Sequence, residues 1–181
     1  MLAEDLILDY RDNRLEFAAP RLHFLSGRPL ERLRNAAEVP FDFQITLWTG
    51  NHQHVARNVF DRFVVSYDLW EETFSVSKIQ NPRRAGSHFT AAAAEAWCLD
   101  QMTMDVTGLS GSEPLWARLE VRAQDSTKDS NLALGRGSIT ETGISLNNLI
   151  EIFSRPPPSQ QPRYVLEAGP VTLDSLRSRR R

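Results

Sequence analysis

The stretch FDFQITLW at residues 41–48 decides the fold of this chain. Its apolar residues recur at every second position, which is the period of a β-strand with one buried and one solvated face. Two more alternating stretches follow at residues 59–67 and 73–79, separated by short polar connectors. We therefore predict a three-stranded antiparallel meander as the base of an all-β core. The residues expected to face that core are Phe41, Phe43, Ile45, Leu47, Phe63, Val65 and Phe74.

Shorter β patterns lie on both sides of the meander. Residues 6–10 and 15–17 surround a polar turn and predict a hairpin, and residues 22–25 predict a further strand. Residues 115–123 alternate again, with opposite charges interleaved on the outer face, which is typical of a solvated strand. Residues 164–167 are compatible with a last strand.

Helical features occur in three segments. A proline near the start and leucines on one face favour a helix over residues 29–37. Residues 88–104, with Ser87 as N-cap, contain the alanine run of highest helix propensity. Residues 145–153 have apolar side chains at i, i+3, i+4 and i+7, which predicts an amphipathic helix that packs on the domain or enters a partner's groove. The apolar stripe of the alanine-rich helix comprises Phe89, Ala92, Ala96 and Leu99.

These elements predict a mainly β fold in one domain. We expect an antiparallel β-sandwich, immunoglobulin-like or similar, of about seven to nine strands with two or three capping helices. The 181 residues, 41% of them apolar and 24% charged, suffice for one sizeable core. We place this domain at residues 1–170, with a long polar loop at 124–143 and a basic tail at 171–181.

Charge and hydropathy narrow the range of partners. A formal net charge of -2 gives no reason to expect nucleic acid as a partner. The apolar runs are too short to span a bilayer, and no signal peptide is visible. The basic tail offers a contact with anionic lipid, although short arginine-rich ends are also common as disordered solubilising tails.

Candidate chemistry is sparse. His52 and His54 form a His-x-His pair, which places two imidazoles on one metal when it lies on a strand. A zinc site needs a third and usually a fourth ligand, and His23 and His88 are distant in sequence. The single cysteine, Cys98, has apolar neighbours and no base or orienting carboxylate near it in the sequence, so we predict a buried core residue.

Trp48 and Trp70 flank the ends of the meander strands. Aromatic side chains at such positions form either a ligand-binding platform or lids over the open ends of a small core. Both interpretations stay open from the sequence, and the two tryptophans are our candidate ligand-binding residues.

Six segments follow one another along the chain: 15–25, PLERL at 29–33, 39–48, 63–76 with Tyr67, Asp68 and Leu69, 89–99 and 115–123. In this order and patterning the chain resembles an uncharacterised bacterial family of unknown function. Proteins of that family are usually exported or envelope-associated and have no activity attached, so the resemblance implies a periplasmic or envelope location and supplies no functional residues.

We therefore expect a non-enzymatic, envelope-associated binding or protein-interaction module with a protein or small-molecule partner and no cofactor. A metal-dependent hydrolase that uses His52 and His54 is one alternative, and a lipid-surface-binding domain is another. A cytoplasmic location is the alternative to the envelope. The sequence leaves the oligomeric state open.

Overall fold

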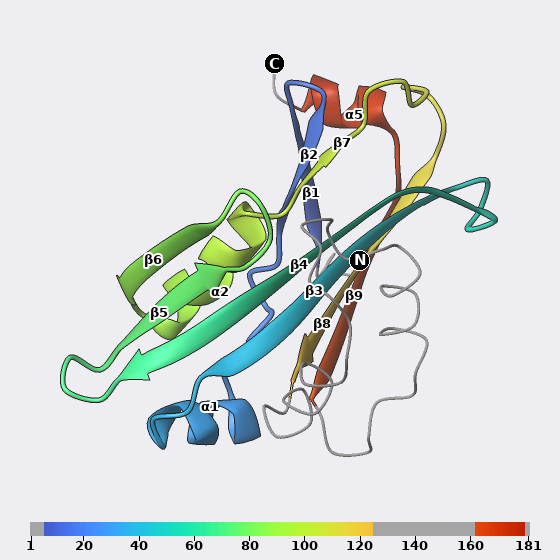
Figure 1. Ribbon diagram of the computed structural model, residues 1–181. Helices are drawn as coiled ribbons and strands as arrows, with labels where there is room; N and C mark the ends of the chain where they lie inside the picture. Colours follow the sequence, from blue (N-terminus) through green and yellow to red (C-terminus); the bar gives the residue numbers. More distant parts are fainter. Residues whose placement is uncertain (1–5, 125–161, 180–181) are drawn as a thin grey trace, which may run out of the picture.

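The computed structural model describes residues 6–124 and 162–179, and its described part contains nine strands and three helices (Figure 1). The strands form two antiparallel sheets, one of three strands in the order β1-β2-β7 and one of six in the order β6-β5-β4-β3-β8-β9. The predicted fold class, a mainly β sandwich with capping helices, is confirmed. The strands are β1 Ile7–Arg11, β2 Arg14–Ala18, β3 Val39–Thr49, β4 His54–Asp68, β5 Thr73–Lys78, β6 Arg84–Phe89, β7 Thr103–Asp105, β8 Leu115–Ala123 and β9 Arg163–Val171.

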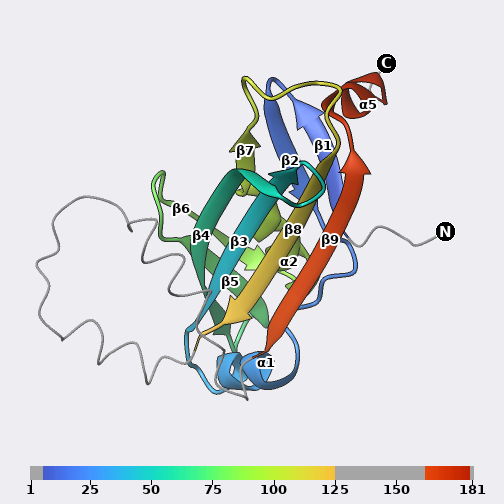
Figure 2. The ribbon, with the colours of Figure 1, turned by 90° about the vertical axis from the view of Figure 1, so that its right-hand side faces the viewer.

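The helices are α1 Gly27–Arg34, α2 Ala91–Asp100 and α5 Leu173–Ser178. Figure 2 shows the six-stranded sheet as one layer, with α2 and the small sheet behind it. The helix α1 lies at one end of this sheet and α5 at the other, next to β1. No helix in the described ranges has the length and apolar character needed to cross a membrane.

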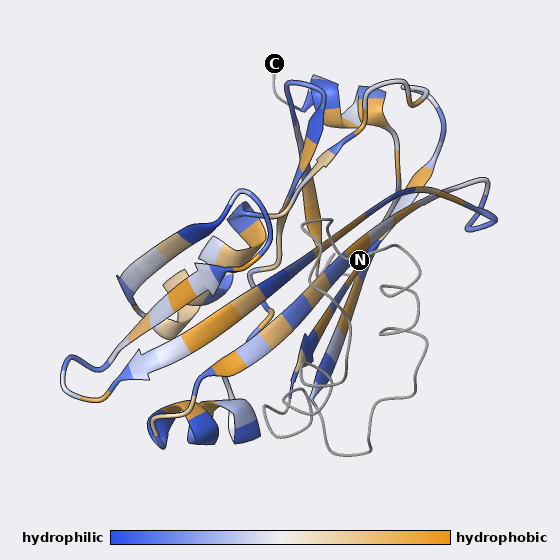
Figure 3. Cartoon of the chain, in the orientation of Figure 1, coloured by the Kyte–Doolittle hydropathy of each residue, from blue (hydrophilic) through white to orange (hydrophobic). Residues whose placement is uncertain are grey.

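The meander of β3, β4 and β5 is confirmed. Phe41 pairs with Phe63 and Val65 pairs with Val76, so apolar side chains of neighbouring strands share one face. All seven side chains predicted to face the core are buried. The alternation of apolar and polar residues is visible along these strands in Figure 3. The period of two in the sequence therefore corresponds, as predicted, to strands with one face in the core.

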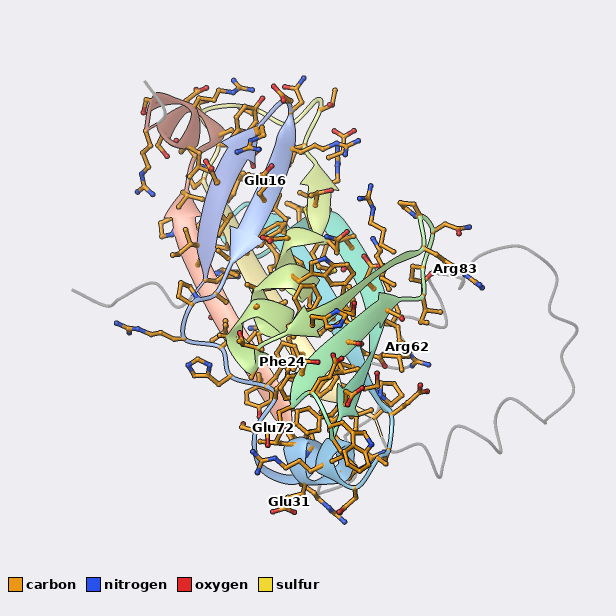
Figure 4. All side chains as sticks on the ribbon, turned by 90° about the vertical axis from the view of Figure 1, so that its left-hand side faces the viewer. Glu16, Phe24, Glu31, Arg62, Glu72 and Arg83 are labelled. Atoms are coloured by element: carbon orange, nitrogen blue, oxygen red, sulfur yellow. The ribbon has the colours of Figure 1, made fainter. Side chains whose placement is uncertain are left out.

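The segment around Phe24 is buried, but it is not a strand, so the prediction for residues 22–25 is wrong. The Phe24 ring centroid lies 4.8 Å from that of Phe41 and 5.2 Å from that of Phe43, in edge-to-face contacts near the middle of the view in Figure 4. The backbone N–H of Leu25 donates to the carboxylate of Glu95, at 2.9 Å, and joins no ladder. Apolar alternation here reflects packing without strand pairing.

The alanine-rich helix is shorter than predicted. The predicted N-cap Ser87 and the first two predicted helical residues, His88 and Phe89, instead belong to the strand β6, in which Phe89 pairs with Phe74 of β5. Thr90 is the N-cap, since its side chain accepts a hydrogen bond from the N–H of Ala93 at 3.2 Å. The buried face of α2 also differs from the predicted stripe, because Ala92 and Ala96 are exposed. The buried residues of this helix are Ala94, Glu95, Cys98 and Leu99.

The helix α1 is also shorter than predicted. It begins after Ser26 and ends at Arg34, and a left-handed Ala36 with φ 60° prevents it from continuing.

The segment predicted as a basic tail, 171–181, instead begins with the end of β9 and the helix α5. Leu173 and Leu176 of α5 are buried, and the helix packs against β1. Thr172 and Ser175 cap its first turn with reciprocal hydrogen bonds between side chain and backbone. These two leucines, three residues apart, bring the segment into the domain despite its arginines. The predicted helix at 145–153 and most of the predicted loop at 124–143 lie outside the described residues.

The outer face of the six-stranded sheet is not a simple solvated surface. Asp42 of β3 is fully buried there, and its carboxylate accepts hydrogen bonds from Arg62 and Gln124. Glu120 and Arg122 of β8, predicted as solvated, are also buried and form an ion pair. Paired charges of this kind explain how polar residues remain on a strand without water around them.

Candidate functional site

The two candidate tryptophans lie at opposite ends of β4. Trp48 is near the β3–β4 turn and Trp70 is in the β4–β5 turn, which Figure 1 shows on opposite sides of the molecule. β4 has 15 residues, and at about 3.3 Å per residue the strand separates these turns by roughly 40 Å or more. The two side chains therefore cannot contact one small ligand together.

Trp48 belongs to a cluster of rings and charges of its own chain. It is the cross-strand neighbour of Trp116, and the His52 ring centroid lies 5.9 Å from that of Trp48 and 4.9 Å from that of Trp116. The guanidinium of Arg118 lies 5.4 Å from the Trp48 ring centroid in a cation–π contact, and it also pairs with Glu167. Neighbours from its own chain therefore already pack against Trp48 on the outer face of the sheet. Trp48 is not among the described residues that pack on the hydrophobic core, so the arrangement supports neither an open ligand platform nor a lid over the core.

His52 and His54 are held by different contacts. His52 turns toward the two tryptophans, whereas His54 lies against the turn, so that a Cβ on Gly50 would be 3.0 Å from its ring. Gly50, Asn51 and His52 all have positive φ, which shapes this tight turn. In the described part of the chain no group of three or more His, Cys, Asp or Glu side chains is placed to hold a metal ion. The geometry therefore adds no further ligand to the pair, and metal binding by these histidines stays a prediction.

Trp70 has a different environment from Trp48. Trp70 is 97% exposed, and Leu69 beside it is 52% exposed. The turn that carries them, residues 69–72, is here called the β4–β5 tip. Asp68 orders it, because its Oδ1 accepts hydrogen bonds from the backbone N–H groups of Trp70, at 2.8 Å, and Glu71, at 3.0 Å. These bonds hold the pKa of Asp68 below its ordinary value, the bond from Glu71 having the larger effect.

The β4–β5 tip also carries acidic side chains. Glu71 pairs with the ring of His88 on β6, with 3.1 Å between Oε2 and Nε2, which connects the tip to the neighbouring strand. Glu72 has a positive φ of 53° and is exposed; it is labelled in Figure 4, which views this side of the molecule. The tip thus combines two exposed apolar side chains with an acidic rim.

A pocket of about 220 Å³ lies between α2 and the segment after β2. We call it the α2 groove. Glu95 is its buried polar residue, with a side chain 8% exposed, and its Oε2 lies 3.1 Å from Nδ1 of His23, whose side chain is 67% exposed. The groove is lined by Phe17, Ala18, Ala19, Pro20, Leu22, His23, Ala92, Glu95, Ala96, Leu99 and Asp100.

Sequence reasoning missed the Glu95–His23 pair. The available signal is that Glu95 lies one turn before Leu99, so a helix that buries Leu99 also turns Glu95 inward. His23, which lies between the apolar residues Leu22 and Phe24, has no comparable signal, because its partner is distant in sequence.

A second hollow, of about 360 Å³, lies between β4 and β7. Arg57 spans it and donates hydrogen bonds to the backbone carbonyls of Asp105, at 3.2 Å, and Thr107, at 2.9 Å. The guanidinium of Arg57 therefore binds the backbone of the segment that follows β7.

Cys98 is fully buried, as predicted. Burial raises the pKa of its thiol, and the nearby Glu95 raises it further. A thiol in this environment stays protonated and does not act as a nucleophile.

Comparison of the chain with family models, with curated proteins and with solved structures finds no match.

Proposed function

We propose that this chain is a non-enzymatic protein-interaction module that docks on its partner through the β4–β5 tip. The observation that carries the proposal is the 97% exposure of Trp70 at the end of a long, ordered hairpin. A large apolar side chain in water forgoes roughly 1.5–3 kcal/mol of burial free energy, which a partner's pocket restores. Tryptophan is also among the residues that most often dominate binding at protein interfaces.

The order of the tip supports this proposal. Asp68 fixes the backbone on the N-terminal side of the turn, and the contact of Glu71 with His88 fixes it against β6. A side chain presented on an ordered backbone loses less conformational entropy on binding than one on a flexible loop. The two contacts therefore favour docking by a preformed surface.

The charges around Trp70 indicate the chemistry of the partner. Glu71 and Glu72 lie next to the apolar pair in sequence and are exposed. An apolar pocket with basic residues at its rim complements such a surface, and charge complementarity mainly increases specificity and the rate of association. We infer a protein partner with a basic rim around an apolar pocket.

Lipid binding is less favoured by the same geometry. The acidic rim of the tip repels anionic headgroups. The helix α5, which carries Arg177 of the predicted basic tail, lies far from the β4–β5 tip in Figure 1. One flat bilayer therefore does not engage both surfaces. The envelope location, which the family resemblance implies, is part of the proposal, and immunoblotting of fractionated source cells tests it separately.

Site-specific photo-crosslinking tests the docking surface. A photoreactive amino acid replaces Trp70 in the full chain within the source cells, and Val165 of β9, which is 42% exposed, serves as the matched control position. We expect a discrete cross-linked protein with the probe at 70 and none with the probe at 165. The dissociation constant of that purified protein should rise at least about 30-fold with Trp70→Ala, which corresponds to about 2 kcal/mol.

Two results would contradict the proposal. One is cross-linking at 165 but not at 70, and the other is an affinity that Trp70→Ala leaves unchanged. Sedimentation with anionic and with zwitterionic vesicles completes the test. Binding to vesicles that Trp70→Ala abolishes would replace the protein partner with a lipid surface.

A further inference from the structure

The α2 groove has the size and the walls of a small-molecule site. Its volume of about 220 Å³ is somewhat larger than an engineered cavity of about 150 Å³ that holds benzene. Two alanines of α2, Ala92 and Ala96, face Ala18 and Pro20 across it, so small side chains keep the hollow open. An apolar body of about the size of one ring fits between these walls.

One end of the groove carries a buried carboxylate with spare acceptor capacity. Oε1 of Glu95 accepts from the N–H of Leu25, and Oε2 lies within hydrogen-bond distance of His23 Nδ1. A carboxylate has about four lone-pair sites, so these two contacts leave room for a further donor. A buried carboxylate gains more from an additional cationic donor than an exposed one, because water screens it less.

The charges that line the groove favour a cation. Glu95 and Asp100 supply two carboxylates, and His23 supplies one imidazole. Among the described residues that line it there is no lysine or arginine. The groove therefore places two carboxylates next to an apolar wall, with the His23 imidazole as their one basic neighbour among the described lining residues.

We propose that the α2 groove binds a small organic ammonium ion, with the ammonium group on the Glu95 carboxylate and the apolar body between the alanines of α2 and the 17–23 segment. This site is separate from the β4–β5 tip and does not depend on the docking function. The ligand class is a primary amine with a single ring or a short alkyl body. A neutral analogue of the same shape binds more weakly, because it leaves the carboxylate without a cation.

Titration followed by amide NMR tests the proposal with benzylammonium and its neutral analogue benzyl alcohol as the probes. The N–H of Leu25 is the reporter, because it donates to Glu95 directly. We expect the wild type to bind benzylammonium at least tenfold more tightly than benzyl alcohol. Glu95→Gln keeps an acceptor for the Leu25 N–H and removes the charge. It should therefore raise the dissociation constant of benzylammonium at least tenfold and change that of benzyl alcohol less than twofold.

A pair of variants on the same helix locates the site. Ala96 and Ala93 are both exposed, but only Ala96 lines the groove. Ala96→Leu fills the groove and should abolish binding of both probes, whereas Ala93→Leu should leave both unchanged. The proposal is overturned if benzylammonium fails to shift the Leu25 resonance in the wild type, or if Ala96→Leu or Glu95→Gln binds it as the wild type does. If Glu95→Gln does not fold, the charge preference of the wild type and the two leucine variants decide the question.

Discussion

Asp61 and Lys78 form an ion pair on the core side of β4 and β5, with 3.1 Å between Oδ2 and Nζ. Both residues are buried. Lys78 Nζ also lies 3.4 Å from the backbone carbonyl oxygen of Gln101, the C-cap of α2, so the pair connects the large sheet to the end of the helix that packs on it. A cation at a helix C-terminus is favoured by the helix dipole as well as by the carboxylate.

Replacement of Lys78 by methionine should destabilise the protein strongly. The substitution keeps the length of the side chain but leaves the Asp61 carboxylate buried without its cation, which typically costs about 3–5 kcal/mol. Urea unfolding at neutral pH measures the change. The double variant Asp61→Leu/Lys78→Met removes both charges and should recover most of the loss; a double variant less stable than Lys78→Met would contradict this account.

The Asp61–Lys78 pair also predicts how the free energy of unfolding depends on pH. Burial raises the pKa of Asp61 above its ordinary value, and Lys78 offsets only part of this effect. A carboxyl with a raised pKa in the folded state contributes stability that is present below its unfolded pKa and is lost as pH rises through the folded pKa. As pH rises from below 3.8, the ordinary carboxyl value, the Asp61→Asn variant should therefore lose less stability, or gain more, than the wild type does. Parallel pH profiles of the unfolding free energy for the two proteins would refute this assignment.

Phe43 is the residue for which the sequence makes the firmest energetic prediction. It is fully buried and makes edge-to-face contacts with Phe24, at 5.2 Å between centroids, and Phe63, at 5.1 Å. Phe43→Ala should reduce the unfolding free energy by about 3–5 kcal/mol. Val165→Ala on the outer face of β9 is the control and should change it by less than about 0.5 kcal/mol. A similar loss in both variants would show that the core is not organised around Phe43.

The meander could be predicted because its information is local. A period of two along 41–48 fixes which side chains point inward, and pairing with β4 and β8 then follows from the need to bury that face. The same rule places Asp61 on the inner face with Phe63, which is a sequence signal for the buried ion pair.

Other elements depend on partners that are distant in sequence. β6 is an edge strand of mostly exposed residues, so it lacks alternation, and the sequence predicts its last two residues, His88 and Phe89, as the start of the following helix. The segment at 22–25 has alternation, but its backbone meets Glu95, 70 positions along the chain. The arginines after residue 176 also obscure the two buried leucines of α5. In each case the deciding contact is absent from the local pattern.

The environments of the two candidate tryptophans also depend on contacts that are distant in sequence. Trp48 and Trp70 are equivalent as sequence signals, since both flank strand ends. Only the pairing of β3 with β8 brings Trp116 and Arg118 to Trp48, while Trp70 lies in a turn beyond the sheet. Exposure, the property that separates a ring packed by its own chain from a docking residue, is therefore a consequence of topology.

Asp68→Ala should loosen the β4–β5 tip without unfolding the protein. The variant removes the acceptor of the Trp70 and Glu71 N–H groups, so amide hydrogen exchange at these two positions should accelerate while exchange in β3 and β8 stays unchanged. Because the folded pKa of Asp68 is lowered, the wild-type tip should loosen in the same way only as pH falls below the ordinary carboxyl value of 3.8.

Asp105 provides the matched control, since its carboxylate accepts from the N–H of Thr107 at 2.7 Å in a turn of similar design. Asp105→Ala should accelerate exchange at Thr107 and leave the tip as it is. If the tip is a preformed docking surface, Asp68→Ala should also weaken partner binding while leaving Trp70 in place, because ordering the turn then adds to the free-energy cost of association. An affinity that is unchanged while exchange at Trp70 accelerates would mean that the partner itself orders the turn, and that preformation contributes nothing to docking.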